Sequence, residues 1–139
     1  MTPEERFEAA AEQARRATCD KAHCGCVIVS NDQIIGRGYN SPPLNDEVNR
    51  RCDRDGCCLH AEWRAIMDAL RHHPDSIIGS ALYFTRVNAA GEILRSGEPY
   101  CTVCSRLALD VGISTFGLWH EDGIKEYPTD EYNRISLRS

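Results

Sequence analysis

The amino-acid sequence predicts an α/β fold in which helices pack against a central sheet. Segments with helical spacing alternate along the chain with short β-rich segments, and a β-hairpin precedes this alternation, an order typical of an α/β sandwich with βαβ-type crossovers. The chain has 139 residues, of which 42% are hydrophobic and 27% charged, which is enough for one domain with a substantial core. We therefore predict a single α/β domain over residues 1–139.

The first predicted elements are a helix over residues 3–17 and a β-hairpin. Pro3 suits the first turn of this helix, and its apolar residues recur at helical spacing; they are Phe7, Ala10, Ala11, Ala14 and Ala17. Two β-rich runs follow, at residues 27–30 and 34–39. The short segment Asn31-Asp32-Gln33 between them predicts the hairpin.

A polar loop and a second helix come next. Residues 41–57 contain two prolines and a glycine and show no sustained period, so we predict a loop. A loop of this length in a compact domain usually has a functional or stabilising reason. Residues 61–71 predict an amphipathic helix that ends before Pro74. Its apolar stripe consists of Trp63, Ile66, Met67 and Leu70, and we assign Trp63 to the core.

The second half of the chain continues the alternation of strand and helix. Residues 80–87 predict a strand, and residues 101–112 predict a helix that Gly112 ends. Residues 114–120 predict a further strand. The tail, residues 121–139, shows no firm pattern, and we predict no element there.

Composition limits the classes of partner. The formal net charge of -5 disfavours an extended nucleic-acid groove, which usually has a basic face, so we predict a small-molecule substrate and no nucleic-acid partner. No run of about 18 apolar residues occurs, and the charged start lacks the apolar stretch of a signal peptide. We therefore predict a cytoplasmic protein without a membrane partner. In that compartment the eight cysteines are expected to be thiols or metal ligands.

Two short motifs suggest a metal site. Cys101 and Cys104 form a C-x-x-C at the start of a predicted helix, which places both sulfurs on one face of its first turn. The helix N-terminus favours thiolates, and zinc accepts Cys and His in tetrahedral geometry. His60 stands at another helix start, with Glu62 two residues later. Alone, a C-x-x-C is also typical of redox centres and structural zinc sites, and a lone histidine is common at a helix start.

Together these motifs resemble the cytidine/deoxycytidylate deaminase superfamily, and deoxycytidylate deaminase most of all. Its signature is H-x-E followed by P-C-x-x-C; here His60-Ala61-Glu62 is followed by Pro99-Tyr100-Cys101-Thr102-Val103-Cys104. Gly38-Tyr39-Asn40 resembles the strand-end motif of the family. Tyr100 departs from the signature, because it separates the proline from the first cysteine. The resemblance covers most of the chain and implies a three-layer α/β/α sandwich with a central mixed sheet of about five strands.

The resemblance also implies a role for each residue of the motifs. It implies one catalytic zinc ion held by His60, Cys101 and Cys104, with Glu62 as proton shuttle and with Asn40 and the Ala61 backbone N–H as substrate contacts. Zinc-bound hydroxide would then attack the ring carbon of a cytosine nucleotide or nucleoside, in a reaction of the dCMP to dUMP type, and ammonia would leave. The resemblance further implies a homo-oligomer. By residue type alone, Asn40 is equally typical of a turn at a strand end.

Other functions remain open at this point. Within the enzyme class, the alternatives are deaminases of guanine, of another small aminated heterocycle or of tRNA adenosine. In a different class, a non-catalytic zinc-stabilised binding module would leave Glu62 without a role. Arg50, Arg51 and Arg54 in the long loop suit a substrate phosphate and favour a nucleotide, but the acidic residues among them are equally typical of a solvated charge run.

The remaining cysteines raise the question of a second metal ion. Some deoxycytidylate deaminases carry a second, structural zinc near the loop before the catalytic histidine. By this resemblance, Cys19 or Cys24 would join Cys52 and Cys57 and hold the long loop in place. The alternative is a set of reduced, partly buried thiols, because these spacings are not the compact C-x-x-C pairs of ordinary zinc clips.

Overall fold

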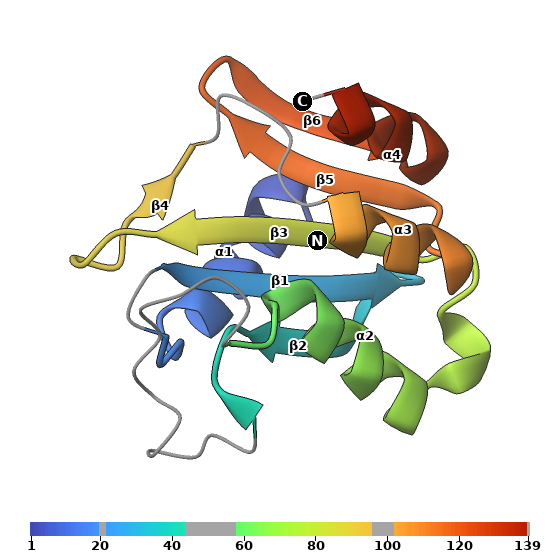
Figure 1. Ribbon diagram of the computed structural model, residues 1–139, viewed down its shortest axis with the longest axis horizontal. Coiled ribbons are helices and arrows are strands. Elements are labelled where there is room, and N and C mark those ends of the chain that lie inside the picture. Colours follow the sequence, from blue (N-terminus) through green and yellow to red (C-terminus); the bar gives the residue numbers. More distant parts are fainter. Residues whose placement is uncertain (20–21, 44–57, 96–101, 139) are drawn as a thin grey trace.

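The computed structural model describes residues 1–19, 22–43, 58–95 and 102–138, and Figure 1 shows its elements in order along the chain. They are α1 (Pro3–Ala14), β1 (His23–Ser30), β2 (Gln33–Tyr39), α2 (Ala61–His72), the 3-10 turn η3 (Pro74–Ser76), β3 (Ala81–Val87), β4 (Ile93–Leu94), α3 (Thr102–Asp110), β5 (Thr115–His120), β6 (Gly123–Pro128) and α4 (Thr129–Arg138). No helix within these ranges combines the length and the apolar character needed to cross a membrane.

The strands form one mixed sheet between two layers of helices. Its order is β2-β1-β3-β5-β6, and β4 pairs with β3 outside this path. β3 and β5 are parallel, and the other neighbouring strands are antiparallel. Helix α1 packs on one face, while α2, α3 and α4 pack on the other (Figure 1). The predicted three-layer fold is confirmed, with six strands where about five were expected.

Helix α2 approaches the sheet closely because its inner residues are small. Its buried residues are Ala61, Glu62, Ala65, Ile66 and Ala69. A Cβ added at Gly38 of β2 would meet the backbone of Ala61 and Ala65, so only glycine admits the helix at this distance. The prediction that the apolar stripe of α2 faces the core is therefore wrong. Of the four stripe residues only Ile66 is buried, and Leu70 is 43% exposed.

The hairpin of β1 and β2 has a tight turn. Ser30 pairs with Gln33, so the loop contains only Asn31 and Asp32. Both have positive φ, 49° and 61°, as a type I′ hairpin turn requires. Strand β1 begins at His23, before the predicted start at residue 27, because Cys24 and Gly25 already pair with β3. Gly25 has low strand propensity, and tertiary pairing outweighs it.

Helix α1 begins as predicted and ends early. Thr2 and Glu5 form a capping box at its start, and Phe7 is fully buried. The helix ends at Ala14 rather than at residue 17, because the next residues form tighter turn bonds and the Thr18 N–H then donates to the Asn40 carbonyl at 3.3 Å. That bond directs the chain toward the sheet.

The C-terminal region contains two elements that were not predicted. Gly112 ends α3 with a φ of 94°, as expected, and the Ile113 N–H donates to the Ala108 carbonyl at 3.0 Å. Strand β6 then pairs along β5, and α4 packs Tyr132 on Phe116 with ring centroids 4.2 Å apart. Strand β6 lies at the edge of the sheet and is mostly polar. Its sequence therefore shows no clear alternation of apolar and polar residues.

Candidate metal centre

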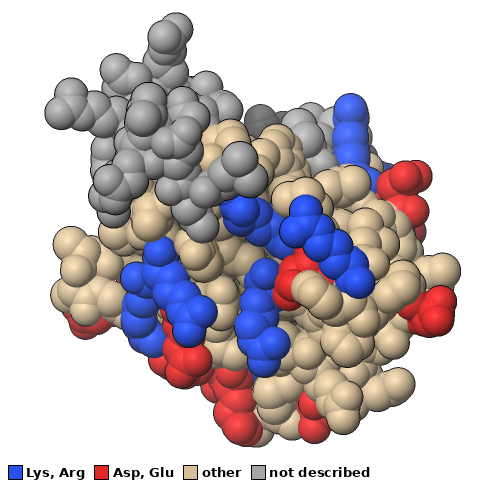
Figure 2. Space-filling model, turned by 90° about the horizontal axis from the view of Figure 1, so that it is seen from below, with Lys and Arg blue, Asp and Glu red and all other residues tan. Residues whose placement is uncertain are grey.

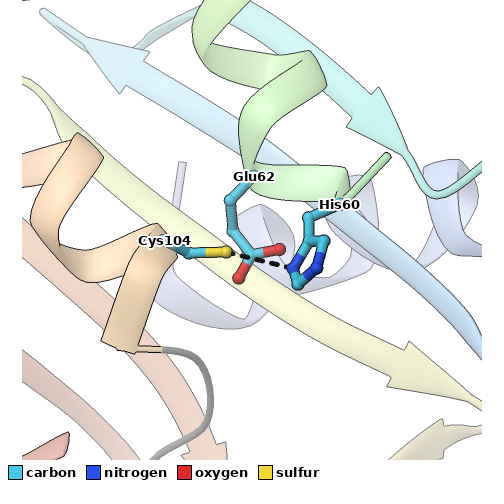
Figure 3. Close-up of side chains that lie close together, drawn as sticks. All are labelled: His60, Glu62 and Cys104. Carbon is cyan, nitrogen blue, oxygen red and sulfur yellow. Dashed lines mark hydrogen bonds between the residues drawn. The ribbon is translucent and has the colours of Figure 1, made fainter. Parts of the chain in front are cut away.

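His60 and Glu62 are positioned by the start of α2. His60 is the N-cap residue, with extended backbone (φ −67°, ψ 147°), and its side chain does not cap the helix. Glu62 follows in the first turn and is only 3% exposed. Both side chains point from α2 toward α3 (Figure 3). Glu62 is thus held inside the protein, next to the start of α2.

Cys104 completes a group of three side chains of types that can bind a metal ion. It lies in the first turn of α3, is fully buried, and has its Sγ 3.2 Å from His60 Nδ1 (Figure 3). One donor atom from each of His60, Glu62 and Cys104 lies within 4.8 Å of the others. In the part of the chain that the structure describes, this is the one such group of three.

The group fits zinc in both chemistry and spacing. Zinc accepts nitrogen, sulfur and carboxylate oxygen, with Zn–N of about 2.0–2.1 Å and Zn–S of about 2.3 Å. At a tetrahedral angle these lengths put nitrogen and sulfur about 3.5 Å apart, close to the observed 3.2 Å between His60 and Cys104. Both helices also present their N-termini here, whose partial positive charge favours the Cys104 thiolate and the Glu62 carboxylate.

Two further cysteines lie on β1 near Glu62. Burial and, second, the charge of Glu62 raise the pKa of Cys24 to about 12. The same two causes raise the pKa of Cys26 well above its ordinary value. Next to the Glu62 carboxylate and without a metal ion, both thiols therefore favour the protonated form at neutral pH.

Asn40 connects the start of β1 to the end of β2. Its Oδ1 accepts from the Cys24 N–H at 2.8 Å, and its Nδ2 donates to the Ala22 carbonyl at 2.7 Å. The side chain is 8% exposed. The structure therefore shows a structural role for Asn40, and its predicted contact with substrate stays a prediction.

Ala61 is the first residue of α2 and is fully buried. The N–H groups of the first helical turn have no acceptor within the helix. The Ala61 N–H is one of these groups, directly between His60 and Glu62. This position suits its predicted role in holding a substrate base, which remains a prediction.

The chain just before His60 is fastened to α2. Ser41 and Leu59 form an isolated antiparallel bridge, with the Leu59 N–H donating to the Ser41 carbonyl at 2.9 Å. Arg64 Nη2 donates to the carbonyls of Pro42 at 2.8 Å and Ser41 at 3.3 Å. Arg64 was not predicted from the sequence as part of this region. It follows His60 by one helical turn, and residues at this spacing are neighbours on a helix.

The position of Trp63 in the structure also differs from the one predicted from the sequence. The residue is only partly buried, and its ring stacks on the His60 imidazole with centroids 4.3 Å apart and planes at 21°. The assignment of Trp63 to the core is therefore wrong. Residues three apart on a helix are neighbours, so the spacing from His60 could have indicated this contact.

Several predicted residues lie outside the described ranges. They are Cys101 and Tyr100 of the C-x-x-C segment, Cys52 and Cys57 of the possible second metal site, and the loop residues Arg50, Arg51 and Arg54. Of that second site, Cys19 and Cys24 are described, and Cys19 is buried. Both Cys19 and Cys24 are free cysteines.

The outer side of α2 carries mixed charge. Figure 2 shows basic and acidic side chains interleaved on the face that carries β2 and α2. A hollow of about 220 Å³ there is lined by Arg37, Arg64 and Arg71 together with Asp68. Asp68 accepts from the Arg37 N–H at 2.9 Å and contacts His72 Nδ1 at 3.0 Å. Three of the four charged residues that line this hollow are therefore basic, and Asp68 is the one acid.

Comparisons with known proteins point to one family. The family model described as "Cytidine and deoxycytidylate deaminase zinc-binding region" matches residues 1–118. A deoxycytidylate deaminase of Schizosaccharomyces pombe is 32% identical over 126 residues, which cover 81% of this chain and 33% of that protein. One of Mycobacterium phage D29 is 28% identical over 117 residues, covering 72% of this chain and 80% of that protein. The chain thus spans about a third of the length of the S. pombe relative.

A solved structure shares the fold. The apo dCMP deaminase of cyanophage S-TIM5 superposes with a TM-score of 0.65 at 24% sequence identity, covering 84% of this chain and 82% of that chain. At this level of identity the likeness concerns the fold.

Proposed function

Because the chain belongs to the family defined by the cytidine and deoxycytidylate deaminase zinc-binding region, we propose that it hydrolytically deaminates a cytosine nucleotide, in a reaction of the dCMP to dUMP type. The observation that carries this proposal is the buried group of His60, Glu62 and Cys104, whose donor atoms lie within 4.8 Å of one another. His60 and Cys104 hold the metal in this proposal, with Cys101 as a third ligand. Glu62 lies beside the metal in this proposal and is not one of its ligands.

The proposed chemistry depends on proton transfer by Glu62. Zinc, when bound, supplies a Lewis acid that lowers the pKa of a coordinated water toward about 7. The Glu62 carboxylate accepts a proton from the attacking water and delivers it to the amine. The ring carbon gains a bond to oxygen and loses its bond to nitrogen, which leaves as ammonia. The burial of Glu62 supports this role, because it keeps bulk water away from the transferred proton.

The substrate is proposed to be a nucleotide of cytosine. The relatives from S. pombe and phage D29 are named deoxycytidylate deaminases, and the cyanophage enzyme has also been solved in complex with dCMP and dUMP. We assign the Ala61 N–H and the remaining hydrogen-bonding capacity of Asn40 to the base. The formal net charge of -5 supports a small substrate over tRNA.

A substrate panel tests the proposal. The purified protein is incubated with dCMP, CMP, deoxycytidine, cytidine and guanine, and ammonia release is followed. We expect dCMP to be turned over fastest. A zinc-loaded protein that turns over guanine but none of the cytosine compounds would contradict the substrate class.

Replacement of Glu62 tests the mechanism. Glu62→Gln keeps the size of the side chain but cannot accept the proton, so kcat is expected to fall by at least about 100-fold while zinc is retained. The control is Glu12→Gln, an exposed change on α1, which should leave kcat unchanged. Full activity in Glu62→Gln would refute the shuttle role. Loss of zinc would instead make Glu62 a ligand.

We further propose a second, structural zinc that involves Cys19 or Cys24 with Cys52 and Cys57. It is supported by the presence of free cysteines at both positions 19 and 24. Elemental analysis of the same protein samples decides between the alternatives. Two zinc ions per chain support the second site, and one ion excludes it.

A further inference from the structure

We propose that Trp63 is a positioning residue that holds the His60 imidazole in the orientation needed to bind zinc. This inference rests on the zinc site proposed above. It concerns how that site retains its metal, and it assigns to Trp63 a role outside the hydrophobic core. The carrying observation is the ring stack between Trp63 and His60.

The geometry of the stack leaves the metal-binding edge of the imidazole accessible. The indole covers one face of the His60 ring, with centroids 4.3 Å apart and planes inclined by 21°. Nδ1, at the edge of the same ring, faces Cys104 Sγ at 3.2 Å. The face of the ring is thus used for packing and its edge for ligation, so the two contacts do not compete.

The two residues share one rigid helix start. Trp63 lies within α2, and His60 is the N-cap residue with a non-helical backbone and no side-chain bond to the helix end. A histidine in this position is not oriented by capping. Stacking on a side chain of the first turn restricts the rotation of its ring, and ligands that are already oriented bind metal with a smaller loss of entropy.

Within the described part of the chain, the indole of Trp63 is held by packing rather than by its own hydrogen bond. Its Nε1 is buried and has no hydrogen-bond acceptor among the described residues. A buried donor without an acceptor is unfavourable, and a phenylalanine has no such donor. Trp63→Phe therefore removes an unfavourable group while keeping an aromatic face, which makes it a useful conservative variant.

The stack also favours the metal-bound form of the histidine. An imidazole coordinated to a divalent cation carries more positive charge than a free neutral ring. Aromatic faces attract positive charge, and tryptophan does so more strongly than phenylalanine. We therefore expect zinc retention to follow the order Trp63, then Phe, then Ala at this position.

Zinc release from the intact holoprotein tests this order. A chromogenic chelator is added to the wild type, Trp63→Ala and Trp63→Phe, and the rate of zinc release is recorded. Trp63→Ala is expected to release zinc about 10-fold to 100-fold faster, as found when residues that orient metal ligands are removed. Trp63→Phe should restore most of the slow release.

A destabilised variant separates positioning from general loss of stability. Ile66→Ala removes a fully buried side chain from the same helix, one turn further along, and should lower the melting temperature without accelerating zinc release in the folded protein. If Ile66→Ala and Trp63→Ala accelerate release equally, Trp63 acts only through stability and the inference is overturned. Equal release rates for the wild type and Trp63→Ala would overturn it as well.

Fluorescence provides a second readout, because the chain has only two tryptophans. Trp119 packs against Phe7 of α1, on the opposite face of the sheet from α2. In Trp119→Phe, the emission of Trp63 should change when zinc is released. In Trp63→Phe, the emission of Trp119 should stay constant. A constant signal in Trp119→Phe would contradict the contact, whereas wild-type protein that binds no zinc would instead refute the proposed function.

Discussion

Asn40 illustrates, at the scale of a single residue, how a motif position can serve the fold as well as the site. Its side chain satisfies a backbone N–H of Cys24 and a backbone carbonyl of Ala22. Its own carbonyl accepts from Thr18. One residue thus joins the end of β2, the start of β1 and the chain leaving α1. From sequence, the family motif and the turn preference of asparagine were equally good explanations.

Asn40→Ala is expected to lower the free energy of unfolding by about 1–3 kcal/mol, because two buried backbone groups lose their partners. Urea unfolding measures the change. Gln33→Ala, an exposed change at the start of β2, is the control and should alter the free energy of unfolding by no more than about 0.5 kcal/mol. An unchanged stability in Asn40→Ala would refute the structural role. A large loss of kcat/KM in the folded variant would add evidence for substrate contact.

At the scale of elements, the contact between α2 and β2 positions the metal centre. Gly38 faces the backbone of Ala61 and Ala65, so the start of α2 rests directly on the strand. His60 and Glu62 belong to this helix start. Any displacement of α2 from the sheet would therefore move both residues relative to Cys104 on α3.

Gly38→Ala is expected to destabilise the fold by about 1–3 kcal/mol, the usual cost of overpacking, because the added Cβ would meet helix backbone that cannot move independently. Urea unfolding and zinc content per chain are the measurements. Leu70→Ala on the exposed side of α2 is the control, with an expected change within about 0.5 kcal/mol. A Gly38→Ala protein as stable as the wild type would show that α2 can shift without cost.

At the scale of the whole molecule, the candidate metal centre joins parts that are distant in sequence. His60 and Glu62 come from α2 and Cys104 from α3, and β3 and β4 lie between these helices in the chain. A bound ion would therefore crosslink the layer of helices on that face of the sheet. The homo-oligomer and the cytoplasmic location that were expected from the sequence remain predictions.

Removal of zinc by a chelator is expected to lower the melting temperature. A ligand present at 100 times its Kd stabilises the folded state by about 2.7 kcal/mol, which corresponds to about 8 °C for a chain of this size. Differential scanning calorimetry with and without chelator measures the shift. His60→Ala should show a much smaller shift. A wild-type melting temperature that is unchanged after verified zinc loss would contradict the crosslinking role.

Local sequence patterns were sufficient for the order of most helices and strands and for the motif residues His60, Glu62 and Cys104. Hydrophobic period and turn residues act over a few positions, so they can be recognised without the third dimension. The polar edge strand β6 and the helix α4 were not predicted, because neither has a strong hydrophobic period of its own. Their burial depends on contacts with β5 and α3.

Tertiary structure decided what the motif residues contact. Helical periodicity indicated α2 correctly, but its buried face was set by the glycines of β2, which select the alanine side of the helix. The same rotation brings Trp63 onto His60 instead of into the core. The sequence by itself determined the element order and the chemistry of the motif, because both depend on residue type and spacing. The depth of helix packing and the ring stack were decided only by contacts between segments distant in the chain.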